Sequence, residues 1–295
     1  MQGIALIDKP QGWTSFDVVA ALRRSLGVKK IGHSGTLDPM ATGVLPVFVG
    51  RATRLIDLLP VTDKRYRATI RFGMTTDTLD ITGEVLSKVP ARVTREELEA
   101  SLPPFRGEIL QVPPMVSALK HNGKRLYELA REGKTVERPA RPVTIYELRC
   151  LGTGAEENEF ILDVACSKGT YVRTLCDDLG KRLGCGAVLS GLCRTEAAGF
   201  SLSECVPIDD ARQMTAQQLL RPVESAVEAY PPVTVSEGQK KRFQNGGKLD
   251  LERLPSARGL CGLVRVTAPH GPCVGLGRVV PEEGCLRIAC LFDQD

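Results

Sequence analysis

The sequence lacks the signatures of several common enzyme classes. It has no G-x-x-x-x-G-K-[ST] loop, no G-x-G-x-x-G after a strand, no G-x-S-x-G elbow and no H-E-x-x-H. Its three histidines, at 33, 121 and 270, are few for a metal centre or a histidine general base. Carboxylates, tyrosines and arginines therefore remain as the candidate catalytic groups.

Signals for membrane insertion or export are also missing. No uninterrupted apolar run is long enough to span a bilayer. The first residues, MQGIALIDKPQGW, lack the basic and apolar regions of a secretion signal. We therefore expect a cytoplasmic protein.

Disulfide and zinc patterns are absent although the chain has ten cysteines. No C-x-x-C occurs, and no Cys/His cluster has the spacing of a zinc site. In a chain without an export signal, the cysteines are expected to be reduced, small and buried apolar residues.

The composition is that of an ordinary globular protein, with one uneven feature. The length of 295 residues suggests one large domain, alone or with a small one. The formal net charge is +4, and residues 120–142 hold seven Lys/Arg against three Glu, an excess equal to that of the whole chain. Such a segment is either a footprint for a polyanion or a solvated helix face with ion pairs.

The first third of the chain predicts three regular elements. GIALIDKP reads as a strand that ends at Pro10. TSFDVVAALRRSLG predicts a helix capped by Thr14 or Ser15 and ended by Gly27, with one apolar side formed by Phe16, Val19, Ala20 and Leu26. KRYRATIRFGM alternates, so it predicts a half-buried strand whose inner face carries Tyr66, Ala68, Ile70 and Phe72.

The rest of the chain divides into a large and a small unit. A capping box at Thr94 and Glu97 opens a short helix, and residues 103–142 predict an extended excursion. EFILDVACSKGTYVRTLCDDLGKRLG predicts a strand, a turn and a helix capped by Thr170, and one more short helix follows at about 207–221. The linker YPPV then precedes a β-rich unit, so we expect domains at 1–229 and 230–295.

Taken singly, the candidate residues do not stand out. Asp38 lies in GHSGTLDPMATGVLP, where an Asp-Pro pair is usually a turn. Tyr66 lies on the apolar face of a strand, where a core role is the usual one. Arg173 is notable only for following Tyr171 at the start of a helix. The acids Asp77, Asp80, Asp177 and Asp178 are rivals to Asp38.

Six motifs in order change this interpretation. GHSGTLDPMATGVLPVFVGRATRL resembles the catalytic motif of the TruB-type pseudouridine synthases, and LIDKPQGWTSFDVV resembles their N-terminal motif. Four further segments are similar to the tyrosine-bearing motif, the RNA-gripping insertion, and the arginine- and leucine-bearing motifs, in this order: KRYRATIRFGMTTDTLDITGEV, VPPMVSALKHNGKRLYELAREG, CSKGTYVRTLCDDLG and LSGLCRTEAAGF. Together they cover most of residues 4–200.

The resemblance implies a fold and an activity. The fold is α+β, with a large mixed, mainly antiparallel sheet flanked by helices, an insertion at about 103–142 and a small β-rich PUA-like domain. The activity is the isomerisation of a uridine to pseudouridine, at position 55 in the T-arm of tRNA. The reaction is redox-neutral and implies no metal and no organic cofactor.

The resemblance also assigns roles. Asp38 matches the essential aspartate, a nucleophile that attacks either C1′ of the ribose or C6 of the uracil. Arg173 matches the arginine that pairs with it and would keep its pKa low. Tyr66 matches the tyrosine that stacks on the flipped uracil and assists proton transfer. The remaining matches are His33 as a wedge, Tyr171 and Leu192 as pocket residues, and Lys9 as a support of the loop.

The insertion and the C-terminal unit are implied to contact RNA. The basic residues expected to contact phosphates are Lys120, Lys124, Arg125, Arg131, Lys134 and Arg141. The C-terminal unit departs from the family pattern, since ACLFDQD replaces a basic, proline-containing end. We expect a monomer that acts on tRNA without an obligatory protein partner. A non-catalytic RNA-binding or RNA-folding module, and a catalytic subunit that works with guide RNAs, are the alternatives.

Overall fold

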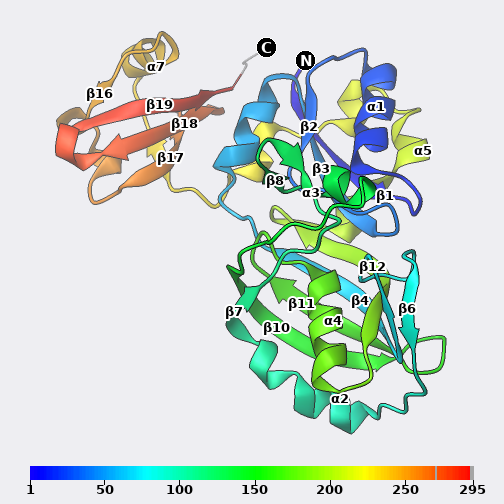
Figure 1. Cartoon of the computed structure of the whole chain (residues 1–295). Helices are drawn as coiled ribbons and strands as arrows, with labels where there is room; N and C mark the ends of the chain where they lie inside the picture. The colour runs from blue at the N-terminus through cyan, green and yellow to red at the C-terminus, as the bar shows by residue number, and fades with distance from the viewer. Residues whose placement is uncertain (270, 293–295) are drawn as a thin grey trace.

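A ten-stranded mixed sheet forms the centre of the molecule (Figure 1). The computed structural model describes residues 1–269 and 271–292, so His270 and the last three residues of ACLFDQD lie outside the described part. The order is β14-β1-β3-β12-β4-β11-β10-β7, with β2 beside β3 and β13 beside β12. In this sheet, as far as the described residues show it, the strand pairs β1–β14 and β3–β12 are parallel and the other pairs are antiparallel, which confirms the predicted mixed, mainly antiparallel sheet.

These strands have the following bounds: β1 Gly3–Lys9, β2 Ile31–His33, β3 Thr42–Val49, β4 Lys64–Phe72, β7 Gly107–Gln111, β10 Arg141–Thr153, β11 Glu159–Cys166, β12 Ala187–Ala197, β13 Phe200–Ser201 and β14 Val206–Pro207. The helices are α1 Ser15–Leu26, α2 Arg95–Ser101, α3 Leu126–Arg131, α4 Val172–Arg182, α5 Ile208–Ala211, α6 Ala216–Leu219 and α7 Glu237–Gln244. The large unit also contains a hairpin of β5 (Met74–Thr76) and β6 (Val85–Lys88) and the 3-10 helices η1 Gly50–Leu58, η2 Pro103–Phe105, η3 Leu202–Glu204 and η4 Val223–Ala226.

Strand β4 has the alternation that its sequence predicts. Its inner residues Tyr66, Ala68, Ile70 and Phe72 are all buried. They belong to one apolar cluster with Leu175 and other residues of α4, the helix that covers this face of the sheet in Figure 1. Strand β4 lies between β11 and β12, and its Tyr66 side chain points to the buried face of the sheet.

Helix α1 has the predicted ends but a different buried side. Thr14 forms a capping box with Asp17, and Gly27 takes the left-handed conformation with φ 65°. The prediction that Phe16 lies on the apolar side is wrong, because its side chain is 65% exposed. The helix packs on the sheet through Val18, Val19, Ala21 and Leu22, a stripe that leaves the Phe16 side chain in solvent.

Two further helix predictions need correction. Thr170 does not cap α4: the cap position is Tyr171, and the Thr170 hydroxyl donates to the Ser167 carbonyl within the preceding turn. The single helix expected at 207–221 is two short helices, α5 and α6, because Thr215 opens a new capping box.

The insertion is shorter than the excursion predicted at 103–142. Residues 107–111 form β7 and pair with β10 from Arg141 onwards, so both belong to the large sheet. The segment that leaves the sheet is 112–140. It carries the small hairpin of β8 (Lys120–His121) and β9 (Lys124–Arg125), followed by α3.

A separate five-stranded sheet follows Tyr230 (Figure 1). Its order is β15-β17-β18-β19-β16, with the bounds β15 Pro232–Thr234, β16 Leu249–Asp250, β17 Gly262–Thr267, β18 Cys273–Val280 and β19 Cys285–Leu291. It has an apolar core of its own around Phe243 and Val264. It is attached to the large unit where the Tyr230 hydroxyl donates to the Leu58 carbonyl at 2.9 Å, next to shared apolar packing.

The ten cysteines are all free thiols, and six of them are buried. Cys261 is the exposed exception to the predicted burial. Within the described residues, no helix combines the length and the apolar character needed to cross a membrane.

Candidate active site

Asp38 and Arg173, which are far apart in the sequence, form an ion pair. Asp38 lies in the loop between β2 and β3, and Arg173 lies in the first turn of α4. The Arg173 Nε atom lies 3.0 Å from Asp38 Oδ2. The arginine side chain is 5% exposed and that of the aspartate is 37% exposed. A buried cation therefore orients a carboxylate that is still partly exposed to solvent.

The other nitrogen atoms of Arg173 are also engaged. Nη1 donates to the Thr78 carbonyl at 3.1 Å and lies 3.7 Å from Asp80 Oδ2. Nη2 donates to the Val116 carbonyl at 2.8 Å, at the start of the insertion. Because each nitrogen has a partner in a different segment, the guanidinium is fixed, and it fixes Asp38 in turn.

The pKa of Asp38 is raised above the usual value for aspartate. Burial of the carboxylate is the main cause, and the negative charge of Asp80 adds to it. The positive charges of Arg173 and Lys9 lower the pKa but do not cancel the rise. The prediction that Arg173 keeps this pKa low is therefore wrong in its net direction, because burial and a second carboxylate outweigh the ion pair.

Tyr66 lies near the ion pair of Asp38 and Arg173. Its side chain is buried on β4, opposite Val164 on one side and Arg194 on the other. Burial raises the pKa of its phenol to about 12, although the nearby Arg194 guanidinium lowers it. The hydroxyl is therefore protonated at neutral pH and can donate a hydrogen bond.

The other predicted pocket residues lie on β2, at the N-terminal cap of α4 and on β12. His33 ends β2, and its Nδ1 accepts from the Gly35 amide at 3.3 Å. Burial and then Arg194 lower the pKa of His33, which favours the neutral ring. The backbone of Tyr171 is fixed by the Gln111 side chain, through bonds of 3.0 and 3.2 Å. Leu192 packs on the apolar cluster that contains Tyr66.

Lys9 is buried against the loop that carries Asp38. Its side chain is fully buried, and its Nζ donates to the carbonyls of Pro10, Trp13 and Pro39 at 2.9, 2.6 and 3.4 Å. Burial lowers its pKa to about 8. Lys9 thus contacts the backbone of Pro39, the residue after Asp38.

Arg194 is a site residue that the sequence analysis did not single out. It lies on β12, two residues after Leu192, and is 1% exposed. Its guanidinium donates to the carbonyls of Val44, Gly35 and Thr36 at 2.7, 3.1 and 3.4 Å. The sequence could have indicated Arg194 through its spacing from Leu192, because residues two apart in a strand lie on the same face.

The basic residues of the insertion lie on the surface. All six predicted RNA contacts are exposed: Lys120, Lys124, Arg125, Arg131, Lys134 and Arg141. Glu132 pairs with Lys124 at 3.2 Å and with Lys134 at 2.7 Å. Arg125 and Arg131 instead lie over the Tyr127 ring, 5.8 and 5.5 Å from its centre. The segment thus contains ion pairs and available cations side by side.

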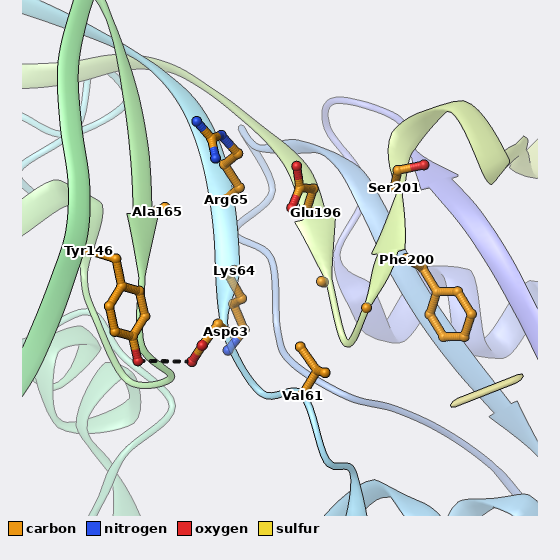
Figure 2. A pocket seen from close by; sticks show the side chains of 11 residues that line it. Val61, Asp63, Lys64, Arg65, Tyr146, Ala165, Glu196, Phe200 and Ser201 are labelled. Carbon is orange, nitrogen blue, oxygen red and sulfur yellow. Dashed lines mark hydrogen bonds between the residues drawn. The ribbon is translucent and has the colours of Figure 1, made fainter. Parts of the chain in front are cut away.

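A hollow of about 300 Å³ beside the start of β4 is separate from the ion pair of Asp38 and Arg173 (Figure 2). It lies near Lys64, where the Tyr146 hydroxyl donates to Asp63 at 3.3 Å. Its lining mixes acids and bases and includes none of the predicted catalytic residues. In the described part of the chain, no group of His, Cys, Asp and Glu has the arrangement of a metal site.

Comparisons with known proteins agree with this arrangement. The profile described as "TruB family pseudouridylate synthase (N terminal domain)" matches residues 23–172, and "tRNA pseudouridylate synthase B C-terminal domain" matches 173–228. Proteins named tRNA pseudouridine synthase B are 45% identical in Stutzerimonas stutzeri, covering 98% of this chain and 94% of the relative, and 43% identical in Clostridium perfringens, covering 94% and 95%. The relative from Escherichia coli K12 is 40% identical, covering 96% and 92%.

A solved structure shows the same fold. The crystal structure of a Cbf5-Nop10-Gar1 complex contains a chain with a TM-score of 0.75 and 27% identity, covering 99% of this chain and 84% of that one. The motifs, the mixed sheet and the family match lead to one conclusion. The chain belongs to the TruB family of pseudouridylate synthases, enzymes that isomerise uridine to pseudouridine.

Proposed function

We propose that this chain converts uridine 55 in the T-arm of tRNA to pseudouridine, with Asp38 as the nucleophile on a flipped-out base. The observation that carries the proposal is the 3.0 Å ion pair of Arg173 and Asp38, beside the buried Tyr66. The names of the sequence relatives, tRNA pseudouridine synthase B, support tRNA as the substrate.

The chemistry needs one nucleophile and no external group. An Asp38 oxygen forms a bond to C1′ as the N1–C1′ bond breaks, or adds to C6 before that bond breaks. The uracil turns, C5 bonds to C1′, and the carboxylate is released. C5 then loses its proton and N1 gains one, so the atoms balance. In both routes Arg173 orients the ionised carboxylate.

The neighbouring side chains would receive the flipped nucleotide. We assign Tyr66 to stacking on the uracil and to a hydrogen bond from its protonated hydroxyl. Tyr171 and Leu192 would contact the nucleotide, and the neutral ring of His33 would occupy the space that the base leaves. Tyr66→Phe retains the ring, so full activity of this variant would leave stacking as the only role.

The remaining surfaces would bind the rest of the RNA. We assign residues 1–229 to the catalytic domain and 230–295 to a PUA-like RNA-binding domain. The exposed cations of the insertion would contact phosphates, so binding should weaken as salt rises. We further propose a cytoplasmic monomer that needs no guide RNA.

Tritium release from C5-labelled uridine in unmodified tRNA tests the proposal. We expect release with the purified chain alone, and none from tRNA with cytidine at position 55. Release only after addition of a guide RNA and partner proteins would support the guide-dependent alternative. Tight tRNA binding without release in any condition would support an RNA-folding module.

A further inference from the structure

Arg194 is a buried charge without a carboxylate partner among the described residues. A guanidinium stays charged at any physiological pH, and its burial is costly unless strong acceptors surround it. The acceptors here are the three backbone carbonyls of Gly35, Thr36 and Val44. An apolar residue in this place would avoid that cost, so the guanidinium needs another explanation.

Its acceptors lie on both sides of Asp38. Gly35 and Thr36 precede the aspartate in the loop, and Val44 follows it on β3. The backbones also meet closely: Gly43 has φ 100°, and a Cβ atom there would collide with the Arg194 carbonyl oxygen. Arg194 therefore holds the start and the end of the loop that carries the aspartate.

The same guanidinium reaches the second catalytic candidate. Arg194 lies directly opposite Tyr66 in the β12–β4 ladder, so both side chains point to the same face. Its positive charge also lowers the pKa of the Tyr66 phenol, so the guanidinium and the hydroxyl interact across the ladder. One side chain thus contacts both the Asp38 loop and the tyrosine that the sheet supplies.

We propose that Arg194 is a positioning residue that fixes the Asp38 loop and Tyr66 relative to each other. It touches the loop backbone and the tyrosine, so it acts through them and not on the substrate. The inference rests on the proposed function for its catalytic consequence. The hydrogen bonds by which Arg194 holds the loop, here called the clamp, do not depend on that function.

Two variants test the clamp. Arg194→Met removes all the donors and keeps an apolar side chain in the core, while Arg194→Lys keeps the charge and reaches fewer carbonyls. The control is Leu98→Ala, a fully buried position on α2 that forms no hydrogen bond to the loop through its apolar side chain. The measurements are the melting temperature, the single-turnover rate on tRNA, tRNA affinity, and hydrogen–deuterium exchange of residues 33–45.

For Arg194→Met we expect faster exchange of the loop and a loss of single-turnover rate of about 100-fold or more, with tRNA affinity within about threefold. Arg194→Lys should have an intermediate rate. Leu98→Ala should lower the melting temperature while its loop exchange and rate stay close to those of the unchanged chain.

Two results would overturn the proposal. One is that hydrogen–deuterium exchange of the loop in Arg194→Met is the same as in the unchanged chain. The other is that Leu98→Ala, at the same melting temperature as Arg194→Met, loses as much of the single-turnover rate. Failure of the proposed function would look different. The unchanged chain would then form no pseudouridine, while the loop exchange of Arg194→Met would still rise.

Discussion

Two turn-rich segments meet at Arg173, and the protein holds them in opposite ways. The loop 32–46 has its backbone oxygens bound at Gly35, Thr36 and Pro39 by Arg194 and Lys9. In the insertion 112–140, Leu126 and Leu129 are buried, but most other side chains are exposed. Its carbonyl contact with the catalytic pair is that of Val116 with Arg173.

The difference shows where rigidity comes from. Glycine and proline are common in both segments, so composition alone does not separate a fixed loop from a surface arm. Buried donors separate them, because each carbonyl that accepts a bond in the interior would be costly to free. The Ser15 hydroxyl adds to this, since it bonds both the amide and the carbonyl of Leu37.

The largest expected effect is that of Asp38→Asn. The amide keeps the size of the side chain but is not a nucleophile, so we expect turnover to fall by about 1,000-fold or more. Affinity for tRNA, measured by filter binding, should stay within about threefold. A variant that still forms pseudouridine at an appreciable rate would remove Asp38 from its assigned role.

A pair of glycine substitutions compares the two segments directly. Gly43→Ala meets both a positive φ and the Arg194 backbone, so we expect a loss of about 3 kcal/mol in the free energy of unfolding. Gly123→Ala, at φ 85° in the β8–β9 turn, has open space around it and should cost about 1 kcal/mol. Urea unfolding measures both, and equal costs would contradict the difference in packing.

Charge neutralisation in the insertion should act on binding rather than on folding. Changing Lys120, Arg125 and Arg131 to Gln removes cations that have no acid within ion-pair distance in the described part of the chain. We expect the slope of log affinity against log salt to become shallower by about 2. The matched control is the pair Lys124→Gln and Lys134→Gln, whose charges Glu132 already offsets, and its slope should change by less than about 1.

The smallest expected effect is a shift of the acidic side of the pH–rate profile. Catalysis requires ionised Asp38, and burial raises its pKa, so the rate should rise with pH through a midpoint above the ordinary aspartate range. Asp80→Asn removes a negative charge that raises this pKa, so the midpoint should move to lower pH. Single-turnover rates across the pH range measure both midpoints, and an upward shift in Asp80→Asn would contradict the electrostatic explanation.

Local sequence patterns correctly predicted strands and helix ends that depend on residues close together in the chain. The alternation in β4 and the caps of α1 were readable because each depends on neighbours a few residues away. The failures had longer-range causes. Phe16 is exposed because a different side of α1 packs against the sheet. Residues 107–111 belong to the sheet because they pair with β10, which is distant in the sequence.

The sequence by itself determined which chemical groups are present: a carboxylate in a turn, a tyrosine on an inner strand face, an arginine at a helix start and a cluster of surface cations. Only the tertiary structure decided the distance of 3.0 Å between Asp38 and Arg173, the raised pKa of that carboxylate and the place of Arg194 beneath the loop. The physical reason is that burial and electrostatic coupling depend on separations in space. Segments far apart in the chain create them when they pack together.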